Sequence, residues 1–289
     1  KALEFIAVQE QFMTPTAKFA DIILPTCTFF ERNDAVWGAG PHVAYQRKVI
    51  EPLVESRSHL AICDDLAARL GINGYNDKTD EQWLEQIMTP CVGDFEKFKE
   101  TGVKKYYNPP SIPFKKEIAD IENSPFPTPS GKIEIFSQQM ADMNNQLLPP
   151  VPTYIEPFES QNDPLAKKYP IQLISTHPKR RSHSQFDNIP WLREVDPQVI
   201  WLNGNDAKAR GIKDGDLVKV FNDRGEVIIK AKVTERIMPG VADLPEGAWY
   251  NPDKNGVDHG GCANVLTIDR RSPGGAFTSN SCLVQVEKA

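Results

Sequence analysis

The sequence predicts a chain of mixed α and β structure that ends in a closed β-barrel. Three observations support this prediction: apolar residues at helical spacing between residues 58 and 102, many prolines between residues 109 and 170, and short alternating β runs from residue 169 onward. Six short strands with one small helix in about 120 residues are typical of a compact closed barrel.

The composition is that of an ordinary globular protein. The chain has 289 residues, of which 40% are hydrophobic, and its 33 basic and 39 acidic residues give a net charge of −6. This balance excludes a disordered acidic tail and argues against a nucleic-acid partner, which would favour an excess of Lys and Arg. No apolar run reaches the roughly 18 residues that span a bilayer. We therefore expect a soluble chain of about two domains.

The first hundred or so residues contain two predicted strands and three predicted helices. Ser58, Thr79 and Asp94 are the expected N-caps, Thr79 as part of a capping box, and Gly71 and Gly102 are the expected ends of the first and third helices. The expected strands are 3–8 and 20–24, and the expected helices are 58–70, 79–87 and 94–102.

A proline-rich region separates this part from the barrel. Within it the alternation of residues 132–136 predicts a strand, and residues 138–143 are a helix candidate. Proline removes an amide donor and fixes φ, so residues 146–168 are expected to form a linker. The predicted domains are therefore 1–145 and 169–289.

The barrel prediction depends on six short runs of alternating residues. A hairpin is expected at Asn222–Gly225, whose residues tolerate positive φ, and a short helix at Asn205–Arg210. The predicted strands are 171–175, 198–202, 216–221, 226–234, 241–244 and 282–286.

The cysteines and histidines give little evidence for a metal site. The five cysteines are widely spaced without a CxxC, which favours free thiols over disulfides, a zinc ribbon or an iron–sulfur cluster. His259 and Cys262 with His177 or His183 could supply zinc ligands, but no close second pair supports this. We expect no metal ligand in this chain.

The loop after the first barrel strand carries most of the polar chemistry. Residues 175–185 contain three cations, two imidazoles and several hydroxyl and amide groups, which could hold a pyrophosphate or a polar heterocycle. A solvated basic loop is the alternative. Asn203 and Asp206 are helix-cap residues that could also face a guanine edge. Neither GxGxxG nor a P-loop lysine motif is present, so an ordinary dinucleotide or NTP fold has no support.

Five motifs stand out along the chain. They are Phe12-Met13-Thr14 with Ala20-Asp21-Ile22-Ile23-Leu24-Pro25, Thr128-Pro129-Ser130-Gly131-Lys132-Ile133-Glu134, Gly211-Ile212-x-x-Gly215-Asp216, Asn222-Asp223-Arg224-Gly225, and Gly247-Ala248-Trp249-Tyr250 followed by Gly260-Gly261-Cys262-x-Asn264. In this order they resemble the dimethyl sulfoxide reductase family of molybdopterin oxidoreductases. The run that begins at Gly247 is most similar to that of anaerobic dimethyl sulfoxide reductase catalytic subunits.

The resemblance implies that the barrel is a six-stranded double-psi β-barrel that binds the cofactor. Residues 1–145 would be an incomplete α/β region from preceding domains, and the opening Lys1–Ile6 reads as the interior of a longer polypeptide. The implied cofactor is molybdenum-bis(molybdopterin guanine dinucleotide), with an iron–sulfur cluster and the protein ligand to molybdenum lying upstream. The expected cofactor contacts are Thr176, His177, Arg181, His183, Ser184, Asn203, Asp206, Trp249, Tyr250 and Asn264.

The implied chemistry is oxygen-atom transfer from S-oxides or N-oxides in the full-length enzyme. No residue of this chain is assigned a catalytic role, and the chain alone is expected to be inactive. The implied partners are the rest of the catalytic chain, an iron–sulfur electron-transfer subunit and a membrane anchor subunit, at the periplasmic face or otherwise on the cytoplasmic membrane of a bacterium. Two alternatives remain: a polysulfide, thiosulfate or selenate reductase, and a cofactor-free double-psi barrel that binds other proteins.

Overall fold

The computed structural model describes residues 3–289, so the first two residues of the opening segment Lys1–Ile6 lie outside the described part. The chain divides into two compact units, residues 1–115 and 116–289. No helix among the described residues is long and apolar enough to cross a bilayer. The domain limits 1–145 and 169–289, with the linker 146–168, stay a prediction.

The first unit begins with two parallel strands, β1 (Ala7–Glu10) and β2 (Ile22–Pro25), with Ala7 opposite Ile22. The predicted strand 3–8 therefore begins four residues too early. The segment before Ala7 is held by a side chain: the Ile6 amide donates to the Asp21 carboxylate at 2.8 Å. Two 3-10 helices flank β2, η1 (Ala17–Phe19) and η2 (Phe29–Glu31).

The rest of the first unit packs three helices and an antiparallel sheet. The predicted N-caps are confirmed: Ser58, Thr79 and Asp94 each accept a backbone hydrogen bond, and Gly102 ends α3 at φ +73°. The sheet was not predicted, because its strands are short and rich in polar residues. The elements are α1 (His59–Arg69), α2 (Asp80–Val92), α3 (Phe95–Thr101), β3 (Asp34–Trp37), β4 (His42–Gln46) and β5 (Val103–Lys105). A core of Val43, Met88, Val92, Phe95 and Phe98 joins the sheet to α2 and α3.

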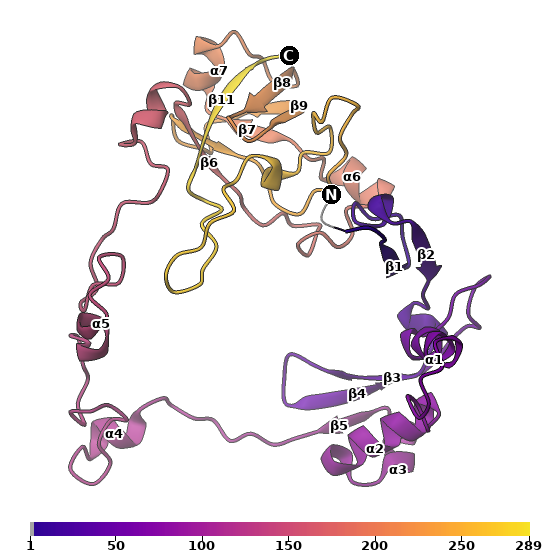
Figure 1. Cartoon of the computed structure of the whole chain (residues 1–289). Coiled ribbons are helices and arrows are strands. Elements are labelled where there is room, and N and C mark those ends of the chain that lie inside the picture. The colour runs from indigo at the N-terminus through magenta and orange to yellow at the C-terminus, as the bar shows by residue number, and fades with distance from the viewer. Residues whose placement is uncertain (1–2) are drawn as a thin grey trace. The chain divides into compact units, whose positions relative to one another are not determined.

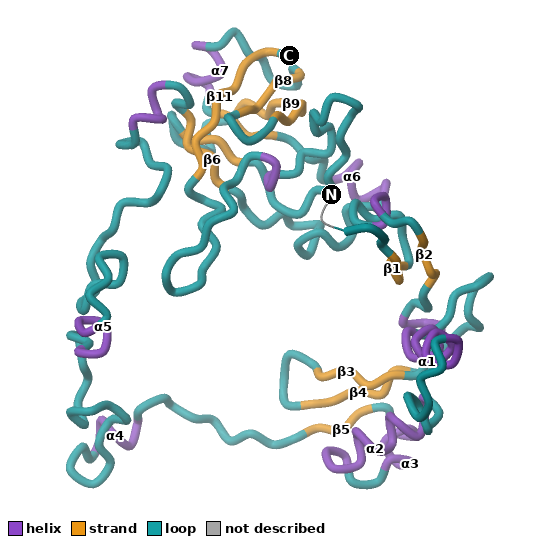
Figure 2. Tube along the Cα trace, in the orientation of Figure 1, coloured by secondary structure: helices purple, strands orange, loops and turns teal. Residues whose placement is uncertain are grey.

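Residues between β5 and the barrel are mostly loop (Figure 2). They carry two short α-helices, α4 (Lys115–Ala119) and the predicted α5 (Gln138–Asp142), and one 3-10 helix close to the barrel. The predicted strand 132–136 is wrong. Its alternating Ile133 and Ile135 are 73% and 75% exposed, and no neighbouring strand pairs with them in the described chain.

The second unit contains a closed six-stranded barrel, in the order β10-β6-β11-β8-β9-β7 (Figure 1). All six strands match predicted runs. Two pairs are parallel, β6 with β10 and β7 with β9, and the others are antiparallel. The strands are β6 (Ile171–Ile174), β7 (Ile200–Leu202), β8 (Leu217–Phe221), β9 (Glu226–Val233), β10 (Val241–Asp243) and β11 (Cys282–Lys288).

The barrel interior is a continuous apolar core. Alternate residues of every strand point inward, as in β9, where Val227, Ile229 and Ala231 are buried. The predicted hairpin is present, since the Asn222 amide donates to the Gly225 carbonyl at 3.2 Å. Short helices lie outside the strands: η3 (Pro164–Lys167), α6 (Pro190–Val195), the predicted α7 (Gly204–Ala209) and η4 (Ala263–Val265).

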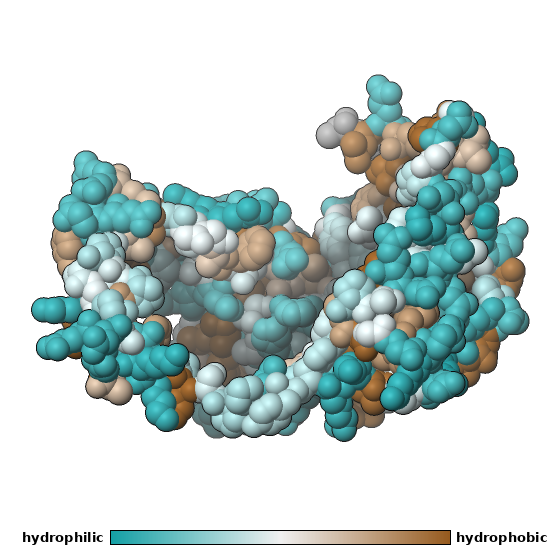
Figure 3. Space-filling model, turned by 90° about the horizontal axis from the view of Figure 1, so that it is seen from below, coloured by the Kyte–Doolittle hydropathy of each residue, from teal (hydrophilic) through white to brown (hydrophobic). Residues whose placement is uncertain are grey.

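Apolar atoms also reach the surface in several places, drawn brown in Figure 3. In the first unit the exposed side chains include Phe19, Phe29 and Trp37, and in the second Trp191 and Phe277. Single exposed apolar residues are common in globular proteins, so they do not by themselves define a site.

Candidate functional site

The site lies where two parallel strands of the barrel end together. In the β6–β10 pair, Ile174 lies opposite Asp243. The following loops remain joined: the Leu244 amide donates to the Ile174 carbonyl at 3.1 Å, and the Glu246 amide to the Thr176 carbonyl at 3.0 Å. Parallel pairing therefore brings the basic loop 175–189 beside the loop 244–250, although they are far apart in sequence.

Asp243 fixes the start of the basic loop. Its side chain is 8% exposed, and its carboxylate accepts from the Thr176 amide at 3.1 Å and from the Thr176 hydroxyl at 2.6 Å. Both donors of Thr176 are thus used within the protein.

Asp187 anchors the far end of the loop. It is 2% exposed and accepts from Arg181 Nη1 at 2.9 Å, Arg193 Nη2 at 2.6 Å and the Trp249 amide at 2.9 Å. Arg193 Nε also donates to the Asp187 carbonyl. A buried carboxylate is stable only when it is paired in this way, so Asp187 holds both loops together.

Arg181 is itself almost fully buried. Its Nη2 donates to Gln198 Oε1 at 2.6 Å and to the Glu246 carbonyl at 3.0 Å, while its buried Nε has no hydrogen-bond partner among the described residues. Gln198 in turn donates to the carbonyls of Pro245 and Gly261. Arg181 is therefore a rigidly held cation with one unsatisfied donor.

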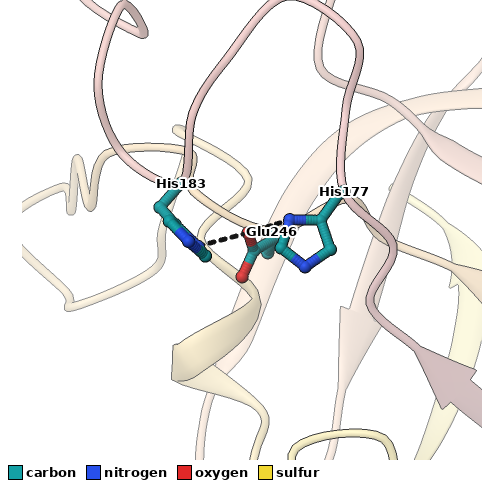
Figure 4. A group of neighbouring side chains, drawn as sticks. All are labelled: His177, His183 and Glu246. Atoms are coloured by element: carbon teal, nitrogen blue, oxygen red, sulfur yellow. Dashed lines mark hydrogen bonds and ion pairs between the residues drawn. The ribbon is translucent and has the colours of Figure 1, made fainter. Parts of the chain in front are cut away.

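Two imidazoles converge on one carboxylate at the exposed edge of the loops (Figure 4). Nδ1 of His177 lies 2.9 Å from Glu246 Oε1, and Nδ1 of His183 lies 2.8 Å from the same atom. Both histidine side chains are 72% exposed and Glu246 is 31% exposed.

The conformation of His183 depends on a glycine opposite it. His183 has φ +52°, a left-handed conformation that side chains other than Gly rarely adopt. A Cβ on Gly247 would lie 1.9 Å from the His183 carbonyl oxygen, and Gly247 itself has φ +86°. Only glycine permits this close approach of the two loops.

A cavity of about 570 Å³ opens beside these loops. Four cationic side chains and His177 line it, against two carboxylates, and Trp201 forms part of its wall below the guanidinium of Arg236, 5.3 Å from the ring centre. This volume and donor set suit a phosphorylated ligand with a planar ring. The charged lining residues are Lys179, Arg181, Lys232, Arg236, Asp196 and Asp243.

A second cavity of about 490 Å³ is lined by Glu246, Asn264 and Thr267. Asn264 belongs to η4, whose position is set by Asp258. This fully buried carboxylate accepts from the amides of Gly260, Gly261 and Cys262 at 2.7–3.1 Å. Burial raises the pKa of the Cys262 thiol, and the pKa of Cys282 rises to about 11 for the same reason, so both thiols stay protonated at neutral pH.

The structure brings some of the predicted contacts together and separates others. Thr176, His177 and Arg181 line the first cavity, and Asn264 lines the second. The Ser184 carbonyl accepts from Trp249 Nε1 at 2.8 Å, within the joined loops. Each assignment as a cofactor contact stays a prediction.

Six predicted contacts line neither cavity: His183, Ser184, Asn203, Asp206, Trp249 and Tyr250. Asn203 caps α7 and donates to the Ile237 carbonyl at 2.7 Å, and Asp206 accepts from the Gly240 amide at 2.7 Å. Both therefore stabilise the α7 end of the barrel through local hydrogen bonds. Tyr250 follows Trp249 in the second loop and is half-buried.

Sequence reasoning missed the acids that organise the site. Asp187, Asp243, Glu246 and Asp258 are scattered in the chain without a motif, and Gln198 was predicted only as the start of a strand. One signal could have identified Glu246: it immediately precedes Gly247, the first residue of a motif already singled out.

Comparisons with known proteins bear on this site. Residues 171–282 match the model of the molydopterin dinucleotide binding domain. They contain both cavities and every barrel strand except residues 283–288 of β11. Residues 1–69 match the molybdopterin oxidoreductase model. The chain belongs to the molybdopterin oxidoreductases. The family prediction is confirmed, and the dinucleotide-binding domain is the barrel.

Two relatives align with almost the entire chain. It is 42% identical to the dimethyl sulfoxide reductase DmsA of Escherichia coli, over 100% of this chain and 38% of that protein. It is 38% identical to the trimethylamine-N-oxide reductase of Pasteurella multocida, over 99% of this chain and 38% of that protein. The chain thus spans 38% of the length of these relatives.

A solved structure supports the fold. Acetylene hydratase from Pelobacter acetylenicus superposes with a TM-score of 0.76 at 22% identity, over 99% of this chain and 40% of that one. This likeness, together with the closed barrel, confirms the predicted fold class. The family matches do not favour the alternative of a cofactor-free interaction module.

Proposed function

We propose that this chain is the part of a molybdenum reductase for S-oxides or N-oxides that holds the dinucleotide of molybdopterin guanine dinucleotide. The observation that carries the proposal is the cationic cavity at the joined loops, within the matched dinucleotide-binding domain. The similarity to reductases named for dimethyl sulfoxide and trimethylamine N-oxide supports this substrate class.

The residues present fit such a cofactor. Phosphate oxygens bind well to cationic donors, and Lys179, Lys232 and Arg236 can supply these from the cavity wall. Arg181 would act mainly as fixed positive charge, because Asp187 and Gln198 already hold its terminal nitrogens. Trp201 offers an apolar ring face for a base. The chain's own task is to bind and orient the cofactor and to neutralise its phosphates.

When bound, this cofactor supplies two-electron oxygen-atom transfer, in which an oxide takes up two electrons and two protons and leaves as the sulfide or amine and water. No side chain of this chain is assigned a proton in that reaction. Polysulfide, thiosulfate and selenate are the competing substrates, and substrate assays on the complete enzyme separate them.

The wider assembly belongs to the same proposal. We infer two molybdopterin guanine dinucleotides, an iron–sulfur cluster in the preceding part of the catalytic chain, and electron delivery by an iron–sulfur subunit held by a membrane anchor. A position at the periplasmic face of the membrane is part of this proposal. The chain by itself is expected to show no turnover with reduced viologen, because it would lack the metal ligand.

The site assignment is tested by cofactor retention in the complete enzyme. Lys232→Gln combined with Arg236→Gln removes two cations from the cavity wall without touching the buried Arg181–Asp187 pair. We expect molybdenum and pterin content per protein to fall several-fold, while thermal unfolding of the apoprotein changes little. Metal analysis and pterin fluorescence measure the content.

Lys230→Gln is the matched control, because Lys230 lies on the same exposed face of β9 as Lys232 but outside the cavity. It should retain the cofactor at the wild-type level. Equal cofactor content in the cavity variant and this control would refute the assignment of this cavity.

A further inference from the structure

We propose that His177, His183 and Glu246 form a binding site for a transition-metal cation of the Zn²⁺ class in the chain when it carries no dinucleotide. The ligand atoms of these three residues all lie within 4.8 Å of one another. No other group of three or more His, Cys, Asp or Glu side chains in the described residues is arranged in this way. The site does not depend on the proposed substrate class.

The donor set matches what Zn²⁺ prefers. Two imidazole nitrogens and one carboxylate oxygen are a ligand set used in zinc sites that keep a fourth position open. Tetrahedral coordination with bonds of about 2.1 Å places ligand atoms roughly 3.4 Å apart. The observed Nδ1–Oε1 distances of 2.9 and 2.8 Å need to open by only about half an ångström on that estimate.

The ligands can make that adjustment because their side chains are free to move while their backbones are fixed. Both imidazoles are 72% exposed. The Glu246 backbone is held on both sides, since its amide donates to the Thr176 carbonyl and its carbonyl accepts from Arg181. Figure 4 shows the carboxylate between the two rings, which approach it from opposite sides.

The local backbone also favours this convergence. A tight turn, with the Gln185 amide donating to the Ser182 carbonyl at 3.0 Å, presents His183 in its left-handed conformation. Gly247 packs directly against the His183 carbonyl and keeps the turn next to Glu246. This group differs from the zinc ligands considered in the sequence, because it contains neither His259 nor Cys262. His259 Nε2 instead lies 3.4 Å from Asp253 Oδ2.

A bound cation would tie the basic loop to the second loop through residues 177, 183 and 246. His177 also lines the cationic cavity. A metal ion there takes the His177 imidazole out of reach of a ligand in the cavity. Zinc and a dinucleotide at this end of the barrel should therefore weaken each other's binding.

The test is a Zn²⁺ titration of the 289-residue chain, followed by calorimetry and by hydrogen exchange of the loop 176–185. The exposed Cys91 and partly exposed thiols are first alkylated, because they could bind zinc independently. We expect one equivalent to bind and slow exchange in the loop, Co²⁺ to give the absorption bands of a low-coordinate site, and Mg²⁺ to leave both readouts unchanged.

The decisive variants are Glu246→Gln and His183→Asn. Gln keeps the size of Glu, and Asn tolerates the left-handed conformation, so both should fold. Each should weaken zinc binding by about 100-fold, since even residues that only support a ligand change affinity by 10–100-fold. His259→Asn removes an exposed imidazole with a single carboxylate neighbour and should bind zinc like the wild type.

The outcomes are distinct from those of the cofactor test. Unchanged zinc affinity in Glu246→Gln and His183→Asn, or no protection of the loop on adding zinc, would overturn the metal site. Neither result depends on cofactor retention by the complete enzyme, so failure of one proposal does not resemble failure of the other.

Discussion

Asp187 is a buried acid whose contacts reach both loops of the site. It pairs with the buried guanidinium of Arg181 and accepts the Trp249 amide, while Arg193 closes the network from the surface. Its importance follows from burial, because an unpaired charge of Arg181 in this position has no water to replace the lost carboxylate.

Asp187→Ala should therefore destabilise the barrel by about 3 kcal/mol, the lower end of the cost of breaking a buried ion pair. Hydrogen exchange of the β6 and β11 amides measures the change. The comparison variant is Glu287→Ala, whose partner Lys219 lies 2.7 Å away in a pair at the barrel surface. It should cost less than about 1 kcal/mol. Similar effects of the two variants would contradict this explanation.

The β8–β9 hairpin has a second task besides closing the barrel. Its Gly225 lies against η4, where a Cβ would meet Val265 Cγ1 at 2.6 Å and the Val265 carbonyl oxygen at 3.1 Å. The neighbouring Arg224 donates to the Leu266 carbonyl at 2.7 Å and pairs with Glu159 at 2.6 Å. The hairpin thus positions the segment that carries Asn264.

Gly225→Ala should displace η4 and destabilise the barrel by about 1–3 kcal/mol, as expected for one extra methyl group in a packed site. Chemical denaturation and the exchange rate of the Asn264 amide are the measurements. Gly274→Ala serves as the control, because a Cβ added at Gly274 would lie 3.9 Å from the nearest atom of another residue. Overpacking is excluded if both variants unfold at the same denaturant concentration.

The strands of the barrel were predictable from sequence because two conditions for a strand are met there. The apolar residues alternate along the chain, and each strand has neighbouring strands to pair with. Ile229 and Ala231 of β9 alternate with lysines, and the strand also has neighbouring strands on both sides. Residues 132–136 alternate equally well, but they have no partner strand in the described chain. Periodicity reports only which face a strand could bury, so it cannot detect a missing neighbour.

The candidate site was only half predictable, for a related reason. The cations of the loop 175–185 stand out because they form one run directly after a strand. Asp187, Gln198 and Glu246 come from separate segments and meet only through the parallel pairing of β6 and β10. The same missing information placed Asn203 and Asp206 among the contacts, although both are held by local hydrogen bonds.

Acid stability of the whole chain depends on carboxylates in both units. The largest effect in the first unit is at Glu31, where amide hydrogen bonds from Thr28 and Leu53, at 2.6 and 2.5 Å, lower the pKa from 4.5 to about 2. A lowered pKa means that the folded state prefers the ionised form. Its stabilisation is complete above pH 4.5 and is lost as the pH falls toward about 2.

Residues 1–115 should therefore lose stability between pH 4.5 and about 2, as measured by hydrogen exchange of the β4 amides. Glu31→Gln should be less stable than the wild type at neutral pH, and the difference should shrink across that interval. A difference that stays constant down to pH 2 would show that Glu31 does not titrate as described.

The parallel pairing of β6 with β10 has a consequence for how the protein is loaded. His177 and Glu246 are joined only when the first and fifth strands of the barrel lie side by side. The unfolded chain therefore has no such binding site. Any ligand that binds at this end of the barrel must stabilise the folded state relative to the unfolded chain. Ligand insertion is then a late step in maturation. A ligand-loaded protein is therefore one whose barrel has already folded.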